Sequence, residues 1–129
     1  MLAQSVRDLD VYKLAFELQQ QIFNLSKSFP KEEMYSLTDQ IRRSSRSVGA
    51  NTCEAWAKRR YPAHFVSKLS DADGETEETL HWIETAFASD YISEKTKEEL
   101  TSQYRHTSGM LNKMMAHPDA WCKHHLNSE

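Results

Sequence analysis

A short basic segment, residues 41–60, carries the side chains best suited to binding a charged partner. It holds six basic residues and one acidic residue, Glu54, which sum to a local charge of +5: Arg42, Arg43, Arg46, Lys58, Arg59 and Arg60. In a helix, Arg42 and Arg46 are one turn apart and Arg43 lies on the adjoining flank. Each guanidinium offers a planar set of N–H donors that matches a phosphate, and neighbouring cations add to the attraction. These residues predict a surface that binds RNA or a ribonucleoprotein partner.

An acidic segment, residues 71–84, supports a second hypothesis. It has six acidic residues and neither Lys nor Arg, a local charge of −6: Asp71, Asp73, Glu75, Glu77, Glu78 and Glu84. Antiparallel helices bring opposite charges together, so the basic and acidic segments can pair within one bundle or between subunits. The second hypothesis is therefore a protein–protein interaction scaffold without nucleic-acid binding, in which the basic helix pairs with the acidic helix of a neighbouring subunit.

A metal-dependent enzyme is the third and weakest hypothesis. Glu78 and His81 have the Glu-x-x-His spacing that di-iron bundle proteins place on two of their helices, but the motif occurs once in this chain. The sequence has neither a Gly-x-Ser-x-Gly turn nor a Gly-rich phosphate loop, and Cys53 has no His nearby in sequence. We therefore predict a protein that is not an enzyme and holds neither a metal nor a cofactor.

Helices separated by short breaks must position these residues. The chain has 129 residues, 39% of them hydrophobic, with only three Gly and three Pro, which favours one all-α domain. Helical periodicity predicts helices over about residues 10–28, 36–58, 63–89 and 94–116, followed by a frayed tail over 118–129. The short connections indicate an up-down-up-down antiparallel four-helix bundle.

The first of these helices has more apolar surface than one bundle needs. Its apolar residues span an arc of about 200°, whereas a surface helix typically needs little more than about 100°. The excess predicts a contact with another subunit through Leu14, Leu18 and Leu25.

Local signals predict how the other helices begin and pack. Ser36 and Asp39 form a predicted capping box at the second helix, and Ser93 is the predicted cap of the fourth. The middle of the second helix is rich in small residues, and we expect a close approach of helices to compensate for the interior Gly49.

The overall composition limits the partners and the location. Sixteen basic against nineteen acidic residues give a net charge of −3, which opposes binding of nucleic acid by the whole surface. There is no signal-peptide pattern and no apolar run of about 20 residues. Without a secretory signal, Cys53 and Cys122 are predicted to be free thiols, and the location is predicted to be cytoplasmic.

Four stretches resemble a known family. They are residues 8–12 (DLDVY), 29–33 (FPKEE), 37–44 (LTDQIRRS) and 50–55 (ANTCEA). They are similar to the four-helix-bundle family of bacterial 23S rRNA intervening-sequence proteins, over about residues 8–118. The related Avd accessory proteins of diversity-generating retroelements are similar in fold.

The resemblance implies a homo-oligomer, a five-fold ring with a central channel, and no defined reaction. Through the Avd relatives it implies binding to a reverse transcriptase and nucleic acid by a basic surface, and Arg42 and Arg43 match the family's motif. The chain departs from the usual family pattern at Gly49, where the family has Pro, and at Ala55, where it has Gly. The resemblance therefore implies a softer kink in the second helix.

Overall fold

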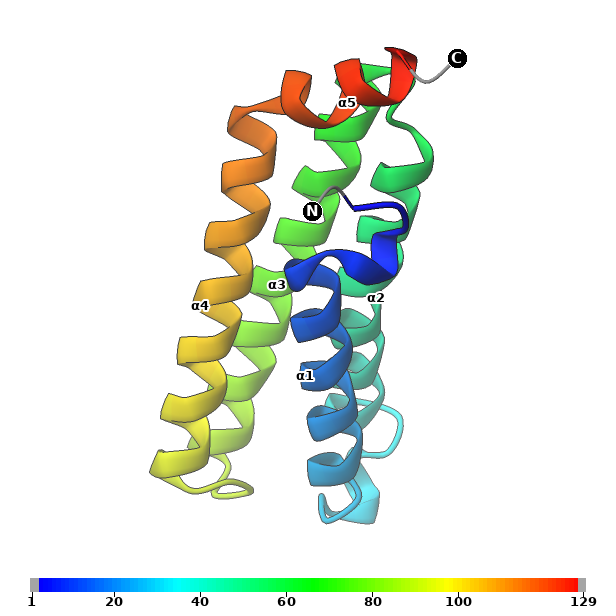
Figure 1. The fold of residues 1–129 in the computed structure, drawn as a ribbon. Helices are drawn as coiled ribbons and strands as arrows, with labels where there is room; N and C mark the ends of the chain where they lie inside the picture. The colour runs from blue at the N-terminus through cyan, green and yellow to red at the C-terminus, as the bar shows by residue number, and fades with distance from the viewer. Residues whose placement is uncertain (1–2, 128–129) are drawn as a thin grey trace.

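Helices form the regular structure of residues 3–127, the part of the chain that the computed structural model describes, with side chains to Cys122. Four long helices follow one another: α1 (Asp10–Ser26), α2 (Leu37–Ala57), α3 (Pro62–Ala88) and α4 (Glu94–Ala116). Short 3-10 turns, η1 (Val6–Asp8) and η2 (Lys31–Glu33), precede α1 and α2, and α5 (Pro118–Asn127) closes the described chain. The long helices alternate in direction (Figure 1), which confirms the all-α up-down-up-down bundle.

The predicted apolar stripes form the core of this bundle. On α2 the stripe is buried along its whole length and consists of Leu37, Ile41, Ser44, Val48, Thr52 and Ala55. Among the described helices, α2 packs most extensively against α3. Inside the interface between α2 and α3, the Thr79 hydroxyl donates to Ser44 Oγ at 2.9 Å. The two small hydroxyl side chains pair with each other, so both of these buried polar groups have a partner.

Gly49 does not have the predicted role of allowing a close helix approach. A Cβ placed on Gly49 would lie 3.8 Å from both Gln19 Oε1 and Tyr12 Cε1, which is ordinary van der Waals contact. α2 also continues through Gly49 without interruption. The position therefore has room for a methyl group, because α1 faces it with flexible side-chain ends rather than backbone.

One of the two predicted helix caps is wrong. The Ser36 hydroxyl donates to Glu33 Oε1 at 2.8 Å instead of accepting from the helix, and Glu33 Oε1 also accepts from the Leu37 amide at 3.4 Å. η2 brings the Glu33 carboxylate to the start of α2, and an anion there is favoured by the exposed amides. The Ser93 cap is confirmed, since its Oγ accepts from the Thr96 amide at 3.1 Å.

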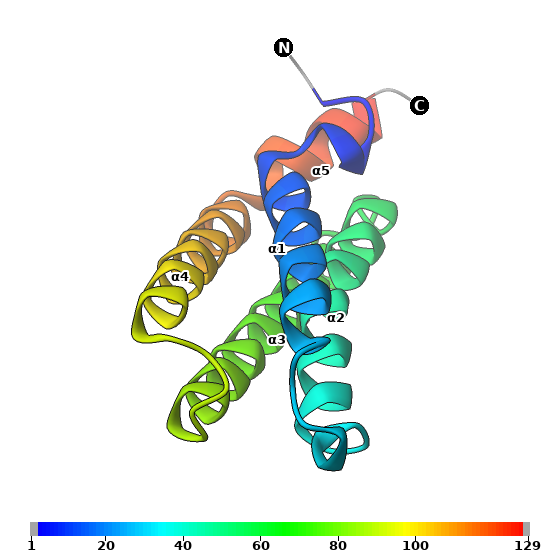
Figure 2. The ribbon, with the colours of Figure 1, turned by 90° about the horizontal axis from the view of Figure 1, so that it is seen from below.

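The tail after α4 is a helix, not the frayed segment predicted from the sequence; residues 128–129 lie outside the described part. Pro118 occupies the first position of α5, where a missing N–H costs nothing. α5 lies across the end of the bundle (Figures 1 and 2), where Cys122 is buried and the Trp121 ring packs against Trp56 with centroids 6.4 Å apart. These apolar contacts hold α5 in place.

Candidate nucleic-acid interface

The six basic residues of residues 41–60 do not form one surface. Arg42 and Arg46 lie on the α1 side of α2, whereas Arg43 lies on the α3 side. Lys58, Arg59 and Arg60 follow at the other end of α2, and the 15 residue steps from Arg42 to Ala57, the last residue of α2, correspond to about 22 Å of helix. The structure therefore divides the predicted site into three parts.

Arg43 is neutralised by the acidic segment of its own chain. Its guanidinium forms ion pairs with Glu75, at 2.8 Å, and with Glu78. These hydrogen bonds raise the pKa of Arg43. Partial burial tends to raise the pKa of Glu78, but the hydrogen bonds from Trp82 and Arg43 outweigh it, so this pKa lies below its usual value. Arg43 therefore joins α2 to α3 within the bundle, and it is not available for the pairing between subunits that the scaffold hypothesis requires.

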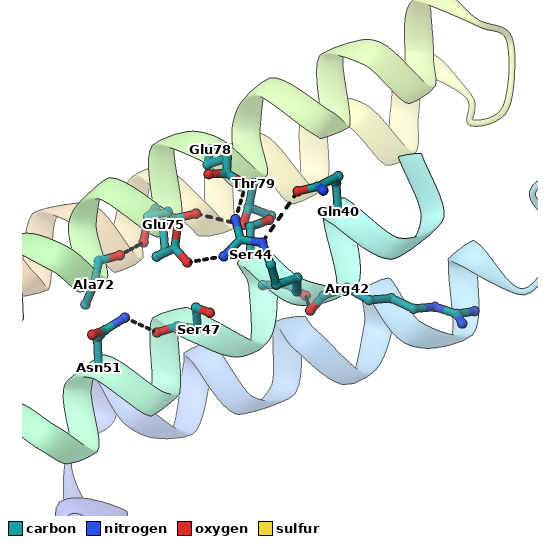
Figure 3. Close-up of polar contacts among 12 residues, drawn as sticks. Gln40, Arg42, Ser44, Ser47, Asn51, Ala72, Glu75, Glu78 and Thr79 are labelled. Carbon is teal, nitrogen blue, oxygen red and sulfur yellow. Dashed lines mark hydrogen bonds and ion pairs between the residues drawn. The ribbon is translucent and has the colours of Figure 1, made fainter. Parts of the chain in front are cut away.

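Arg42 and Arg46 lie on an aromatic ring of α1. Their guanidinium carbons are 4.7 Å and 5.3 Å from the centroid of the Phe23 ring. Arg42 Nε also donates to Ser26 Oγ at 2.7 Å, and the side chain extends over α1, away from Glu75 and Glu78 (Figure 3). The Lys27 ammonium lies 4.7 Å from the same ring. Three cations thus surround Phe23, and we call Lys27, Arg42, Arg46 and Phe23 the Phe23 cluster.

Within the described side chains, neither Arg42 nor Arg46 has an acidic partner, in contrast to Arg43. Each guanidinium is held by cation–π contact, which leaves N–H donors directed to solvent rather than to a carboxylate. Such an arginine is already positioned, so less side-chain entropy is lost when it binds an anion. The cluster can therefore bind phosphate groups.

A groove of about 590 Å³ lies beside these arginines, and the sequence did not predict that Tyr35 lines it. Tyr35 and Met34 line one end, and Arg42, Arg43 and Arg46 line the other. Tyr35 is 89% exposed and Met34 is 50% exposed, although both are large apolar side chains. Tyr35 lies in the turn before α2, which begins at Leu37, so helical spacing gave no signal that it lines the same groove as Arg42.

The basic residues at the end of α2 have a different environment. The Arg59 guanidinium carbon lies 3.5 Å from the Trp56 ring centroid, its Nε donates to the Trp56 carbonyl at 2.8 Å, and burial lowers its pKa. Lys58 and Arg60 are exposed where α2 connects to α3. Arg59 thus stabilises the packing of Trp56, which in turn contacts α5.

The acidic residues of α3 are largely compensated inside the bundle. Besides the Arg43 pairs, Glu77 pairs with Arg105 of α4 at 2.6 Å, and Asp73 accepts from the Ser108 hydroxyl at 2.6 Å. Lys68 Nζ lies 3.7 Å from Asp71 Oδ2 and 2.9 Å from Oε2 of Glu54 on α2. The −6 segment therefore serves mainly to pair α3 with its neighbours.

The Glu78 and His81 pair is not arranged as a ligand set. Glu78 Oε2 accepts from both Arg43 and Trp82 Nε1, and the His81 ring packs on the Trp82 ring with centroids 4.7 Å apart. Among the described residues, no cluster of three or more His, Cys, Asp or Glu has a geometry suited to a metal ion. In the same part of the chain, no helix is long and apolar enough to cross a membrane.

The predicted subunit contact on α1 needs one correction. Leu18 is 1% exposed and belongs to the core between α1 and its neighbours, so a second subunit cannot reach it. Leu14 and Leu25 are half-buried against the same core. The exposed apolar residue of α1 is Phe16, at 47%, because it lies on the Phe23 side of the helix rather than on the core side.

Comparisons with known proteins agree with the helical fold and with the family resemblance of the sequence. The family model described as 23S rRNA-intervening sequence protein matches residues 7–113. A crystal structure described as a protein with unknown function from the S23 ribosomal protein family of Bacteroides thetaiotaomicron VPI-5482 has 29% sequence identity and a TM-score of 0.74. That match covers 82% of this chain and 95% of the other. The comparison with curated proteins gives no match.

Proposed function

Because the chain belongs to the 23S rRNA-intervening sequence protein family, we propose that it is a non-enzymatic adaptor that binds RNA or a ribonucleoprotein through the Phe23 cluster. The structural neighbour is described as a protein with unknown function, and the ribosomal name of its family supports the proposal. A cytoplasmic location goes with this proposal, since ribosomal RNA is found there.

One observation carries the proposal. Arg42 and Arg46 are both held on the Phe23 ring, at 4.7 Å and 5.3 Å, without an acidic partner among the described side chains. Two positioned guanidiniums about 6 Å apart along the helix favour a polyanion over a single carboxylate. Phosphate contacts of this kind supply most of the sequence-independent affinity for nucleic acid.

The net charge of −3 does not oppose this role. Glu75 and Glu78 form ion pairs with Arg43 of α2 and Glu77 pairs with Arg105 of α4, so part of the acidic field of α3 is compensated within the bundle. Exposed charges separated by more than about 8 Å are screened at physiological ionic strength. A phosphate at the Phe23 cluster is therefore influenced mainly by the three cations around it.

The test is binding of a structured RNA over a series of salt concentrations. The Arg42→Ala/Arg46→Ala variant is expected to reduce the slope of log K against log salt by about 1.4 to 1.8, because two phosphate contacts are lost. The matched control is Lys95→Ala/Lys97→Ala on α4, which removes two positive charges, one of them also stacked on an aromatic ring, and should leave the slope unchanged. Equal slopes for the two double variants, or no binding by the parent protein, would overturn the proposal.

We further propose that the protein forms a homo-oligomer, with the five-fold ring of its family as the expected form. The support is the apolar surface of α1: Phe16 is 47% exposed on one side of the helix, and Leu14 and Leu25 are half-buried on the other side, against the core. Phe16→Glu is expected to lower the molar mass measured by light scattering without loss of helical content. A monomeric parent protein, or an unchanged oligomer in the variant, would count against this interface.

A further inference from the structure

The groove beside the Phe23 cluster has two chemically different ends. Asp39, Arg42 and Arg46 follow at spacings of three and four residues, which places them on one face of α2, and Tyr35, in the turn before α2, lines the same groove. At the Arg46 end, positioned guanidiniums attract an anion. At the Tyr35 end, the groove is lined by an exposed aromatic ring and by the Asp39 carboxylate, which repels an anion.

This polarity matches the two parts of a nucleotide. A phosphate is drawn to the arginine end, while the flat face of a nucleobase can stack on the Tyr35 ring, which is 89% exposed. The Asp39 carboxylate only accepts hydrogen bonds, so it excludes phosphate from the aromatic end but tolerates base amino groups. The groove volume of about 590 Å³ is within the usual range for a small-molecule site.

We propose that this groove binds an unpaired segment of RNA, with one base stacked on Tyr35 and phosphates of the same strand at Arg42 and Arg46. The inference rests on the proposed RNA binding and goes further by specifying the kind of RNA. In an A-form duplex the bases are already stacked and paired, so Tyr35 reaches no base face. A duplex lying along the groove would also bring phosphates against Asp39. Loops, bulges and single strands avoid both problems.

The position of Tyr35 suits a stacking platform. It lies between η2 and α2, and this connection is held by the Glu33 carboxylate, which accepts from the Ser36 and Tyr91 hydroxyls, each at 2.8 Å. Tyr35 therefore projects from an anchored turn rather than from a loose loop. Because the ring is almost fully exposed, its removal leaves the core of the bundle intact.

The experiment compares one oligoribonucleotide as an unpaired strand and as a blunt duplex with its complement, by fluorescence anisotropy. Tyr35→Ala is expected to weaken binding of the unpaired strand about 5- to 150-fold, the range typical of one lost stacking contact. Tyr35→Phe keeps the ring and should bind like the parent protein. Tyr61→Ala removes another exposed tyrosine, 54% exposed and near the far end of α2, and should have no effect.

Two further readouts separate this inference from the proposal on which it rests. Stacking involves no counterion release, so Tyr35→Ala should keep the parent's salt slope while Arg42→Ala/Arg46→Ala reduces it. If Tyr35→Ala binds the unpaired strand like the parent, or if the duplex binds as tightly as the strand, the stacking inference is wrong and the phosphate contacts stand. If neither the strand nor the duplex binds, both the stacking inference and the proposed RNA binding are wrong. A protein is then the expected partner.

Discussion

The clearest test of the divided basic segment is the comparison of two neighbouring arginines. Arg43→Ala should lower the stability of the bundle without removing a phosphate contact, whereas Arg42→Ala should remove a phosphate contact. The reason is geometric: Arg43 faces Glu75 and Glu78 on α3, whereas Arg42 lies over Phe23 on α1. Sequence alone gives both residues the same charge and adjacent positions.

The expected loss of stability can be worked from the exposure of the three side chains. Arg43 is 46% exposed, and Glu75 and Glu78 are 19% and 35% exposed. Partly exposed ion pairs typically contribute about 0.2–1 kcal/mol each, so removing two of them should cost about 1 kcal/mol. With an m-value of about 2 kcal/mol/M, the urea midpoint should fall by about 0.5 M. Arg105→Ala is the control, because it removes one pair between two more exposed side chains, and should cost less.

The same variant should change the pH dependence of unfolding. The pKa of Glu78 is lower in the folded protein than its usual value, so its contribution is present above about pH 4.3 and is lost as the pH falls. Without Arg43 that pKa moves back toward its usual value. The free energy of unfolding of Arg43→Ala should therefore fall less between pH 5 and pH 3 than that of the parent protein.

Urea denaturation and the salt dependence of RNA binding, both measured on Arg42→Ala and Arg43→Ala, test whether the two arginines have these different roles. The slope of log K against log salt should fall by about 0.7–0.9 for Arg42→Ala and stay unchanged for Arg43→Ala. An Arg43→Ala variant with parental stability and a reduced slope would refute the reasoning, because Arg43 would then contact the partner rather than α3.

Three other substitutions test the structure. The Tyr104 hydroxyl is buried and has no hydrogen-bond partner among the described residues, so Tyr104→Phe should raise the free energy of unfolding in urea by about 1 kcal/mol; a lower stability would show a hidden partner. Gly49→Ala should stabilise α2 by up to about 1 kcal/mol, measured the same way, since a Cβ fits; destabilisation would indicate a clash. Hydrogen bonds from Ser36 and Tyr91 lower the pKa of Glu33, so Glu33→Gln should lose less stability than the parent in acid titrations from pH 5 to pH 3, and an identical pH profile would contradict this.

Much of the fold could be predicted from residues close together in the chain. Apolar spacing located the four long helices to within two residues at each end, and Ser93 was identified as a cap. α5 was missed because Pro118 ends one helix and equally begins another, and only the packing of Trp121 on Trp56 decides between these outcomes. The predicted Ser36 cap is wrong because η2 brings the Glu33 carboxylate to the start of α2, where it accepts from the Leu37 amide.

The candidate site was predicted less completely, for a physical reason. The sequence by itself determined a basic segment, an acidic segment and the helical faces on which their residues lie, since these depend on composition and period. Only the tertiary structure decided that α2 turns Arg43 toward α3 and Arg42 toward Phe23, that Leu18 is buried, and that Tyr35 is left exposed. The rotation of a helix about its axis is set by the packing of distant side chains, and a rotation of one residue, about 100°, separates an arginine that holds the bundle together from one that faces a partner.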